Sequence, residues 1–227
     1  INLGIRLFIN NLLIQSPLAM RKQPVQKRAQ LTIEAIFQAT AQLVEREGMA
    51  HLTTNKIALK AGFSVGTLYQ YFSSKDEIFR ALVQFSREQV LKELSSYMYR
   101  IETKTDKQYR DPEDFFKHYI AICCKGFAFG DEDLRCVHRL CWMVETPEEC
   151  IATLNLMIER LHSCLNYIKH PYFSKMSGMR CYVLNRSLMG CLRSASLEKM
   201  SLENAKEFED ALLEMTLGQL QQSLSTH

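Results

Sequence analysis

The fold is decided by residues 52–75, which read LTTNKIALKAGFSVGTLYQYFSSK. Apolar residues recur at helical spacing on both sides of Gly62, and they predict two short helices that share a small core. The predicted core residues are Ile57, Ala58, Ala61, Leu68 and Phe72. Thr53 or Thr54 can cap the first helix, and Gly62 can end it. The stretch therefore predicts a helix–turn–helix.

The second of these helices, which we expect to begin at residues 64–66, has a face suited to a DNA groove. Its outward side chains are small, hydroxylated or aromatic, namely Val65, Gly66, Thr67, Tyr69, Gln70 and Tyr71. Such a face can enter a major groove about 12 Å wide. Hydroxyl groups, Lys75 and main-chain amides can hydrogen-bond phosphates. Packing between helices is the alternative role for Tyr69 and Tyr71.

Helical patterns continue on both sides of this motif. Residues 27–47 are amphipathic and are followed by Gly48, a suitable helix end. Downstream, periodicity and cap signals predict helices at about 75–100, from 111, at 132–145, 147–170, 175–198 and 202–224. No segment alternates apolar and polar residues as a strand does. The sequence thus predicts an all-α protein of about nine helices, with an N-terminal three-helix domain and a C-terminal bundle.

The charge of the 227-residue chain is unevenly distributed. Residues 21–75 hold eight Lys or Arg and three Asp or Glu, whereas residues 76–227 hold nineteen and twenty-two. A basic head on a mildly acidic body is typical of a nucleic-acid-binding module, although ordinary surface charge is an alternative. The hydrophobic content of 47% excludes a disordered chain, and the scarcity of Gly and Pro argues against a turn-rich β fold.

Residues 57–82, IALKAGFSVGTLYQYFSSKDEIFRAL, resemble the DNA-binding signature of the TetR family of bacterial transcriptional regulators. The resemblance extends over residues 28–82. It implies that the first three helices bind double-stranded DNA and that a divergent C-terminal domain binds a small molecule and forms a homodimer. A typical member is a repressor that leaves a palindromic operator when an inducer binds.

The resemblance also implies roles for single residues. Thr54, Thr67, Tyr69, Tyr71 and Lys75 would hold phosphates, while Val65, Gly66 and Gln70 would face bases, with Tyr69 a candidate for both. Asn55 could pair with adenine or lie outside the groove. The predicted DNA-binding residues are Thr54, Asn55, Ser64, Val65, Gly66, Thr67, Tyr69, Gln70, Tyr71 and Lys75, with a basic arm of Arg21, Lys22, Lys27 and Arg28. The arm could instead be a solvated terminus, and Lys56 could approach a phosphate.

The C-terminal region carries two predicted sites. Amphipathic stripes at the position of the family's dimerising helices predict an interface made of Val183, Leu184, Leu188, Gly190, Leu192, Leu213, Leu217 and Leu220. Candidates for an effector pocket are Phe115, Phe116, Tyr119, Cys123, Phe127, Trp142, Met143, Met157, Leu161 and Tyr167. Aromatic and Met side chains line apolar pockets, but they also fill ordinary cores, which is the alternative for each of them.

The eight cysteines lie between Cys123 and Cys191 without any CxxC spacing. They predict core packing in a reducing cytoplasm, with a thiol sensor at Cys123/Cys124 or Cys136/Cys141 as the alternative. No catalytic motif or metal-ligand spacing is present in the sequence, so we expect no enzyme, no metal and no cofactor. An alternative regulator would be gated by oxidation or by a protein partner.

The first residues do not fit the rest of the chain. Residues 1–19 are apolar but interrupted by polar residues, and Met20 begins a basic stretch. We expect residues 1–19 to be an upstream or non-native extension, residues 20–75 to be the DNA-binding domain, and residues 76–227 to be the effector-binding and dimerisation domain.

Overall fold

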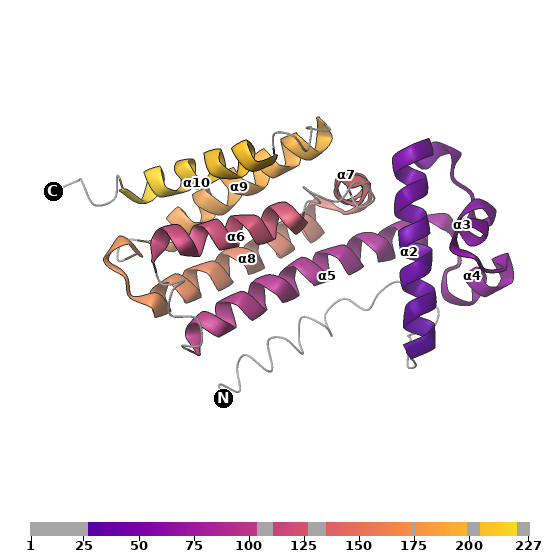
Figure 1. The fold of residues 1–227 in the computed structure, drawn as a ribbon, viewed down its shortest axis with the longest axis horizontal. Helices are drawn as coiled ribbons and strands as arrows, with labels where there is room; N and C mark the ends of the chain where they lie inside the picture. The colour runs from indigo at the N-terminus through magenta and orange to yellow at the C-terminus, as the bar shows by residue number, and fades with distance from the viewer. Residues whose placement is uncertain (1–26, 104–110, 127–134, 174–175, 199–204, 222–227) are drawn as a thin grey trace. The chain divides into compact units, whose positions relative to one another are not determined.

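The computed structural model describes residues 27–103, 111–126, 135–173, 176–198 and 205–221 (Figure 1). Within these ranges it contains nine α-helices and no strand. The helices are α2 (Lys27–Glu47), α3 (Thr54–Ala61), α4 (Val65–Tyr71), α5 (Lys75–Glu102), α6 (Pro112–Gly126), α7 (Arg135–Val144), α8 (Pro147–Ile168), α9 (Gly178–Leu197) and α10 (Ala205–Gln221). Two 3₁₀ turns accompany them, η1 (Met49–His51) and η3 (Pro171–Phe173). The predicted all-α fold is confirmed.

Side-chain caps set the helix boundaries where the sequence predicted them. Thr53, rather than Thr54, caps α3 by accepting a hydrogen bond from the Lys56 amide at 3.3 Å. Gly62 ends α3 with φ 78°, a left-handed conformation that glycine adopts without a Cβ penalty. Thr146 and Glu149 form a reciprocal capping box at the start of α8. Interactions within one helical turn therefore fix these ends of α3 and α8.

The later boundaries depart slightly from the prediction. Helix α8 stops at Ile168 because Lys169 takes a left-handed conformation, and η3 follows. Helix α9 begins at Gly178, after the N-cap Ser177, rather than at residue 175. The predicted start of the last helix, at residues 201–203, lies outside the described residues, as do the first nineteen residues and Met20.

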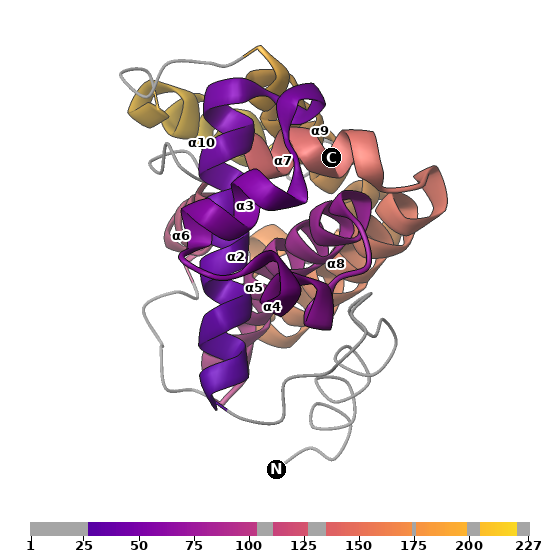
Figure 2. The same ribbon diagram turned by 90° about the vertical axis from the view of Figure 1, so that its right-hand side faces the viewer.

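The described chain divides into two compact units. The first contains α2, α3, α4, α7 and the part of α5 up to residue 88. Helix α3 packs on α2 and α4 packs on α3 (Figure 2), and Ile36, Phe37, Leu68 and Phe72 are central to the shared core. Helix α7 also packs on α2, through Val137. The boundary predicted between residues 75 and 76 separates a DNA-binding domain from an effector-binding domain. It is a division by function and stays a prediction.

The second unit contains the rest of α5 together with α6, α8, α9 and α10. Helix α6 packs against α10 and α8 against α9, and the helices run roughly alongside one another (Figure 1). Its core is rich in large aromatic side chains that are almost completely buried, including Tyr97, Phe115, Phe116 and Tyr119. Among the described helices of both units, none combines the length and apolarity needed to cross a bilayer.

Candidate DNA-binding surface

The first unit holds α3 and α4 in place through a closed apolar core. Ile57, Ala58, Leu68 and Phe72 have no exposed surface, and the Phe72 ring lies 5.9 Å from that of Phe37 on α2. Burying a side chain of this size stabilises the fold by about 1.5–3 kcal/mol. The core predicted between the two short helices is confirmed, with Ala61 half-buried at its edge.

The outward side of α4 is formed by Gly66, Tyr69 and Gln70, all of which are exposed. A Cβ added at Gly66 would meet nothing nearer than the Ser64 hydroxyl oxygen at 3.7 Å. The chain's own packing therefore does not require a glycine there. Glycine inside a helix is unfavourable by about 1 kcal/mol relative to alanine, so its presence is better explained by something that approaches from outside.

Two other residues of α4 that were predicted to bind DNA pack partly against the core instead of lying fully on the outward side. Val65 and Tyr71 are half-buried and pack against the core of the first unit. Packing between helices was the open alternative for Tyr71, and the structure shows that packing contact. Val65 keeps part of its surface exposed, as does Tyr71, so contact with DNA at either position stays a prediction.

Hydroxyl groups that lie far apart in the sequence meet beside this face. The Thr54 hydroxyl of α3 lies 3.1 Å from the Tyr69 hydroxyl of α4, and the Ser64 hydroxyl lies 2.9 Å from that of Thr67. Ser64 also accepts the Thr67 amide at 3.0 Å and so caps α4. A hydroxyl both donates and accepts hydrogen bonds, so these pairs can bond a phosphate oxygen as well as each other.

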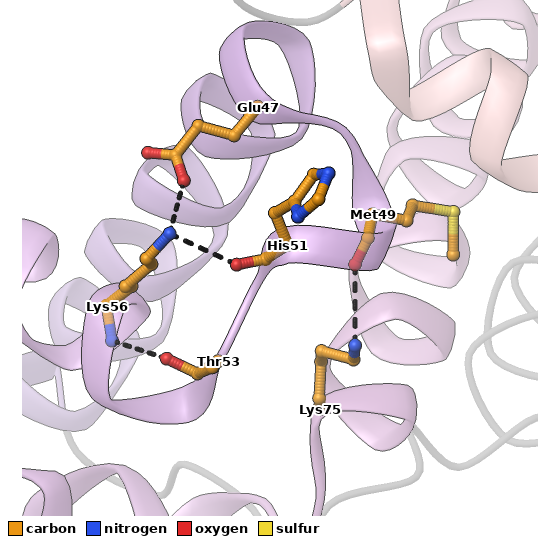
Figure 3. A network of polar contacts seen from close by, with 6 residues as sticks. All are labelled: Glu47, Met49, His51, Thr53, Lys56 and Lys75. Carbon is orange, nitrogen blue, oxygen red and sulfur yellow. Dashed lines mark hydrogen bonds and ion pairs between the residues drawn. The ribbon is translucent and has the colours of Figure 1, made fainter.

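Two lysines of this region reach the same short turn, η1 (Figure 3). The Lys56 ammonium donates to the Glu47 carboxylate at 2.6 Å and to the His51 carbonyl at 3.2 Å. Lys75 donates to the Met49 carbonyl at 3.4 Å. Lys56 is therefore engaged in bracing α3 to the end of α2, whereas Lys75 makes one such bond with an ammonium that carries three donors.

The remaining predicted contacts are placed as follows. Asn55 is exposed on α3, and Arg28 is exposed in the first turn of α2. Lys27 begins α2, but its side chain lies outside the description, and so do Arg21 and Lys22. Of the four side chains of the predicted basic arm, the structure thus describes only that of Arg28.

The sequence prediction missed a bracing contact at the start of α5. Glu77 accepts hydrogen bonds from both the main-chain amide and the hydroxyl of Ser73, and its own amide donates to Ser74 at 3.2 Å. The Ser74-x-x-Glu77 spacing is the usual signal for such a cap and could have revealed it. This cap fixes the turn between α4 and α5, from which Lys75 extends.

The effector-pocket candidates do not all come together. Phe115, Phe116, Tyr119, Cys123, Met157 and Leu161 share the core of the second unit. Trp142 and Met143 belong to α7 in the first unit, where Met143 is 68% exposed. Tyr167 is exposed as well, and Phe127 lies outside the described residues. A buried pocket in the second unit can therefore draw on six of the ten candidates.

The predicted dimer residues also fall into two groups. Leu184, Leu188, Leu192 and Leu220 are buried in the core of their own chain, where Leu213 and Leu217 also pack. Val183 and Gly190 are exposed on α9. Their helix also exposes the large apolar side chains of Met179, Tyr182 and Leu197. Core packing was the stated alternative, and the buried leucines show it; Leu213 and Leu217 are half-buried, and dimer contact stays a prediction for all eight residues.

Burial suppresses the reactivity of the predicted thiol sensor. Burial raises the pKa of Cys124 and Cys164 to about 12 and that of Cys181 to about 11, and it raises the pKa of Cys123 further. The thiolate is the reactive form, so these four thiols are inert at neutral pH. Cys141 is half-buried, and the side chain of Cys136 is not described.

Comparison with known proteins shows which family of proteins the helix–turn–helix resembles. Residues 36–82, from the middle of α2 into α5, match the family model for bacterial regulatory proteins of the tetR family. The predicted resemblance is confirmed: the chain carries the helix–turn–helix of TetR-family transcriptional regulators.

Two curated relatives match part of the chain. An uncharacterized HTH-type transcriptional regulator of Haemophilus influenzae is 36% identical over 86 residues, which are 38% of this chain and 40% of that protein. The nucleoid occlusion factor SlmA of Actinobacillus pleuropneumoniae is 36% identical over 72 residues, which are 32% of this chain and 34% of that protein. The chain thus spans two fifths or less of these relatives.

The likeness to solved structures extends over both units. A TetR transcription regulator from Haloarcula marismortui has a TM-score of 0.62 and 17% sequence identity, covering 82% of this chain and 97% of that one. At this identity the similarity concerns the fold alone, and it agrees with the all-helical architecture described above.

Proposed function

We propose that this protein is a homodimeric transcriptional repressor that binds a palindromic operator and leaves it when a small-molecule inducer occupies the second unit. The observation that carries the proposal is the exposed face of α4, with a glycine that the chain's own packing does not require. The match of residues 36–82 to a family of DNA-binding regulators supports it. Such a protein would act in the cytoplasm, where bacterial DNA is found.

In this proposal α4 enters the major groove, and its surroundings hold the DNA backbone. Gly66 allows close approach to the base edges, and Gln70 can make a bidentate bond to adenine. The Thr54–Tyr69 and Ser64–Thr67 hydroxyl pairs and Lys75 bond the flanking phosphates. Lys56 is excluded from this set because it bonds Glu47 and His51.

Dimer formation is assigned to the outward side of α9. The helix exposes Met179, Tyr182, Val183 and Leu197, and Gly190 lies exposed between them with nothing within 4 Å of an added Cβ. As at Gly66, a glycine that the chain's own packing does not need is explained by close approach of a partner. A two-fold dimer would present two α4 helices to half-sites about 34–36 Å apart.

A second candidate function is a DNA-binding factor gated by a protein partner. A relative named as a nucleoid occlusion factor shares 36% identity with a third of this chain and favours this candidate. Gating by oxidation has less support, because four of the buried thiols have raised pKa values. A protein-gated factor would bind DNA equally well with and without small molecules.

Selection from random duplex DNA tests the proposed function. We expect enrichment of a palindrome whose half-sites lie about one helical turn apart, because two α4 helices would read them. The control is a Gly66→Ala, Gln70→Ala double variant, which keeps the fold but should enrich no such consensus. Recovery of unenriched DNA by the folded wild-type protein would contradict the proposal.

A further inference from the structure

The core of the second unit contains two polar side chains without a hydrogen bond. Tyr119 of α6 and Asn185 of α9 have no exposed surface. The Tyr119 hydroxyl and both ends of the Asn185 amide lack a hydrogen-bond partner among the described residues. A buried polar group left in this state destabilises a protein by about 1–3 kcal/mol, so a core retains it for a reason other than its own stability.

Two other fully buried polar groups of the second unit are satisfied, whereas the Ser196 hydroxyl of α9, which is 8% exposed, also lacks a partner among the described residues. The Tyr97 hydroxyl, equally buried, donates to the Phe115 carbonyl at 3.1 Å. The buried Thr216 hydroxyl donates to the Leu212 carbonyl at 2.8 Å. Tyr97 and Thr216 are thus paired while Tyr119 and Asn185, which are equally buried, are not.

Tyr119 and Asn185 belong to one local cluster, although α6 and α9 are distant in the sequence. Burial raises the pKa of Tyr119 well above its usual value, the nearby Cys123 and Cys181 raise it further, and the neighbouring Asn185 opposes them. Asn185 and Cys123 therefore lie close enough to the Tyr119 hydroxyl to affect its pKa through weak hydrogen bonding, although no bond among them has the distance and angles of a formed hydrogen bond. Among the described residues, no cation is one of the groups that affect the pKa of Tyr119, so their contribution to the cluster consists of donors and acceptors without a charge.

Aromatic rings pack beside the ring of Tyr119. The Phe115 ring lies 6.2 Å from that of Tyr119 and nearly parallel to it, and the Phe116 ring lies 6.3 Å away at a steep angle. Phe173 of η3 packs on both phenylalanines. An apolar molecule would find complementary surroundings here, with its polar end at Tyr119 and Asn185.

We infer that Tyr119 and Asn185 form the polar end of the effector site and bind the uncharged head group of a largely apolar molecule, such as a primary amide. The inference rests on the proposed function and specifies its ligand. An amide matches both ends of the Asn185 side chain and can also bond the Tyr119 hydroxyl. A carboxylate is excluded, because a buried charge without a cation is strongly unfavourable. Since both side chains are fully buried, a bound ligand must separate α6 from α9.

A pair of probes tests the head group on the full-length protein. Decanamide and decanoate have the same chain length and differ in charge. We expect decanamide to raise the melting temperature and to bind in calorimetry, and we expect decanoate to do neither at the same concentration. Absence of decanamide binding, or equal binding of decanoate, would overturn the inference.

Three conservative variants locate the site. Tyr119→Phe and Asn185→Leu should each weaken decanamide binding about tenfold, since each removes hydrogen bonds to the head group. Tyr97→Phe is the matched control, because it removes a satisfied hydroxyl from the same core. We expect it to leave decanamide affinity unchanged within about twofold. Equal losses in all three variants would overturn the assignment of the site.

Stability without any probe gives an independent readout. Tyr119→Phe and Asn185→Leu should leave the melting temperature unchanged or raise it, because they remove unpaired polar groups, whereas Tyr97→Phe should lower it. A fall with Tyr119→Phe as large as that with Tyr97→Phe would show a satisfied hydroxyl and overturn the inference. DNA binding by the wild-type protein is measured in parallel: if it persists while decanamide fails to bind, the proposed DNA-binding function stands without this ligand site.

Discussion

The two units of the molecule place their functional groups in opposite environments. In the first unit the polar side chains of interest are on the surface, where the hydroxyl groups of Thr54 and Tyr69 lie 3.1 Å apart over a largely apolar core. In the second unit they are inside, where Tyr119 and Asn185 lie buried among aromatic rings. A surface suits a large, charged partner such as DNA, and a buried polar cluster suits a small molecule that can replace core packing.

The surface of the first unit depends on the apolar core under α4. A cavity in that core should therefore have the largest effect on stability. Phe72→Ala would leave a cavity beside Phe37 and destabilise the protein by about 3–5 kcal/mol. Urea denaturation measures the change. The control Leu59→Ala truncates a side chain that is 82% exposed on α3, and it should change the unfolding free energy by less than about 0.5 kcal/mol. Equal effects would mean that the core is not where we place it.

Gln70 tests whether the surface of the first unit reads sequence. It is exposed on α4, and a lost bidentate base contact reduces discrimination by about 1–3 kcal/mol. We expect Gln70→Ala to relax the preference at one base pair of each half-site, as measured by competition with single-base operator variants. An unchanged preference would remove Gln70 from the base-reading residues.

The two lysines that hydrogen-bond to η1, Lys56 and Lys75, allow a finer test of contact with the DNA backbone. Lys75→Ala should weaken binding to all DNA sequences and lower the slope of log affinity against log salt by about 1 for each protomer. Lys56→Ala should leave the slope unchanged, because Lys56 is engaged with Glu47 and His51, and the exposed pair contributes about 0–1 kcal/mol to stability. Fluorescence anisotropy at several salt concentrations measures both. The reverse result would exchange the roles of the two lysines.

The thiols of the second unit give the smallest effect. Cys181 has a pKa near 11 when folded, against an ordinary value of 9.0, so it stays protonated while the unfolded chain ionises. Folding stability from this group is therefore complete below pH 9 and is lost as the pH rises from 9 towards 11. At pH 8 a thiol reagent should react with Cys181, Cys123, Cys124 and Cys164 only after denaturation. Rapid labelling of these four in the folded protein would restore the case for an oxidation sensor.

The sequence predicted what depends on neighbours along the chain. The end of α3 at Gly62 and the start of α4 at Ser64 depend on contacts within one helical turn, so local spacing predicted them, although it left Thr53 and Thr54 as alternative caps of α3. The helix–turn–helix core and the family resemblance followed from the same local pattern. These features brought most of the predicted DNA-binding residues onto or beside one described surface.

Features that depend on contacts between distant segments could not be predicted from the sequence. Lys56 bonds Glu47 and His51 through folding of α2 and η1 around α3, and spacing does not reveal that pairing. Helix α7 packs on α2, so Trp142 and Met143 belong to the first unit rather than to the second. The buried position of Asn185 beside Tyr119 needs two helices, α6 and α9, that are not consecutive in the sequence. An apolar stripe along a helix predicts which side of the helix is buried. It does not show which polar side chains of two different helices come together.

The most direct test of the central claim is the effect of Gly66→Ala on folding and on DNA binding in the same preparation. The added methyl group would meet only Ser64, at 3.7 Å, and alanine favours a helix over glycine by about 1 kcal/mol. We predict unchanged or increased stability together with at least about tenfold weaker DNA binding, since a methyl group there would hinder approach to the groove. Wild-type DNA affinity in the stably folded variant would contradict the claim that this face of α4 contacts DNA.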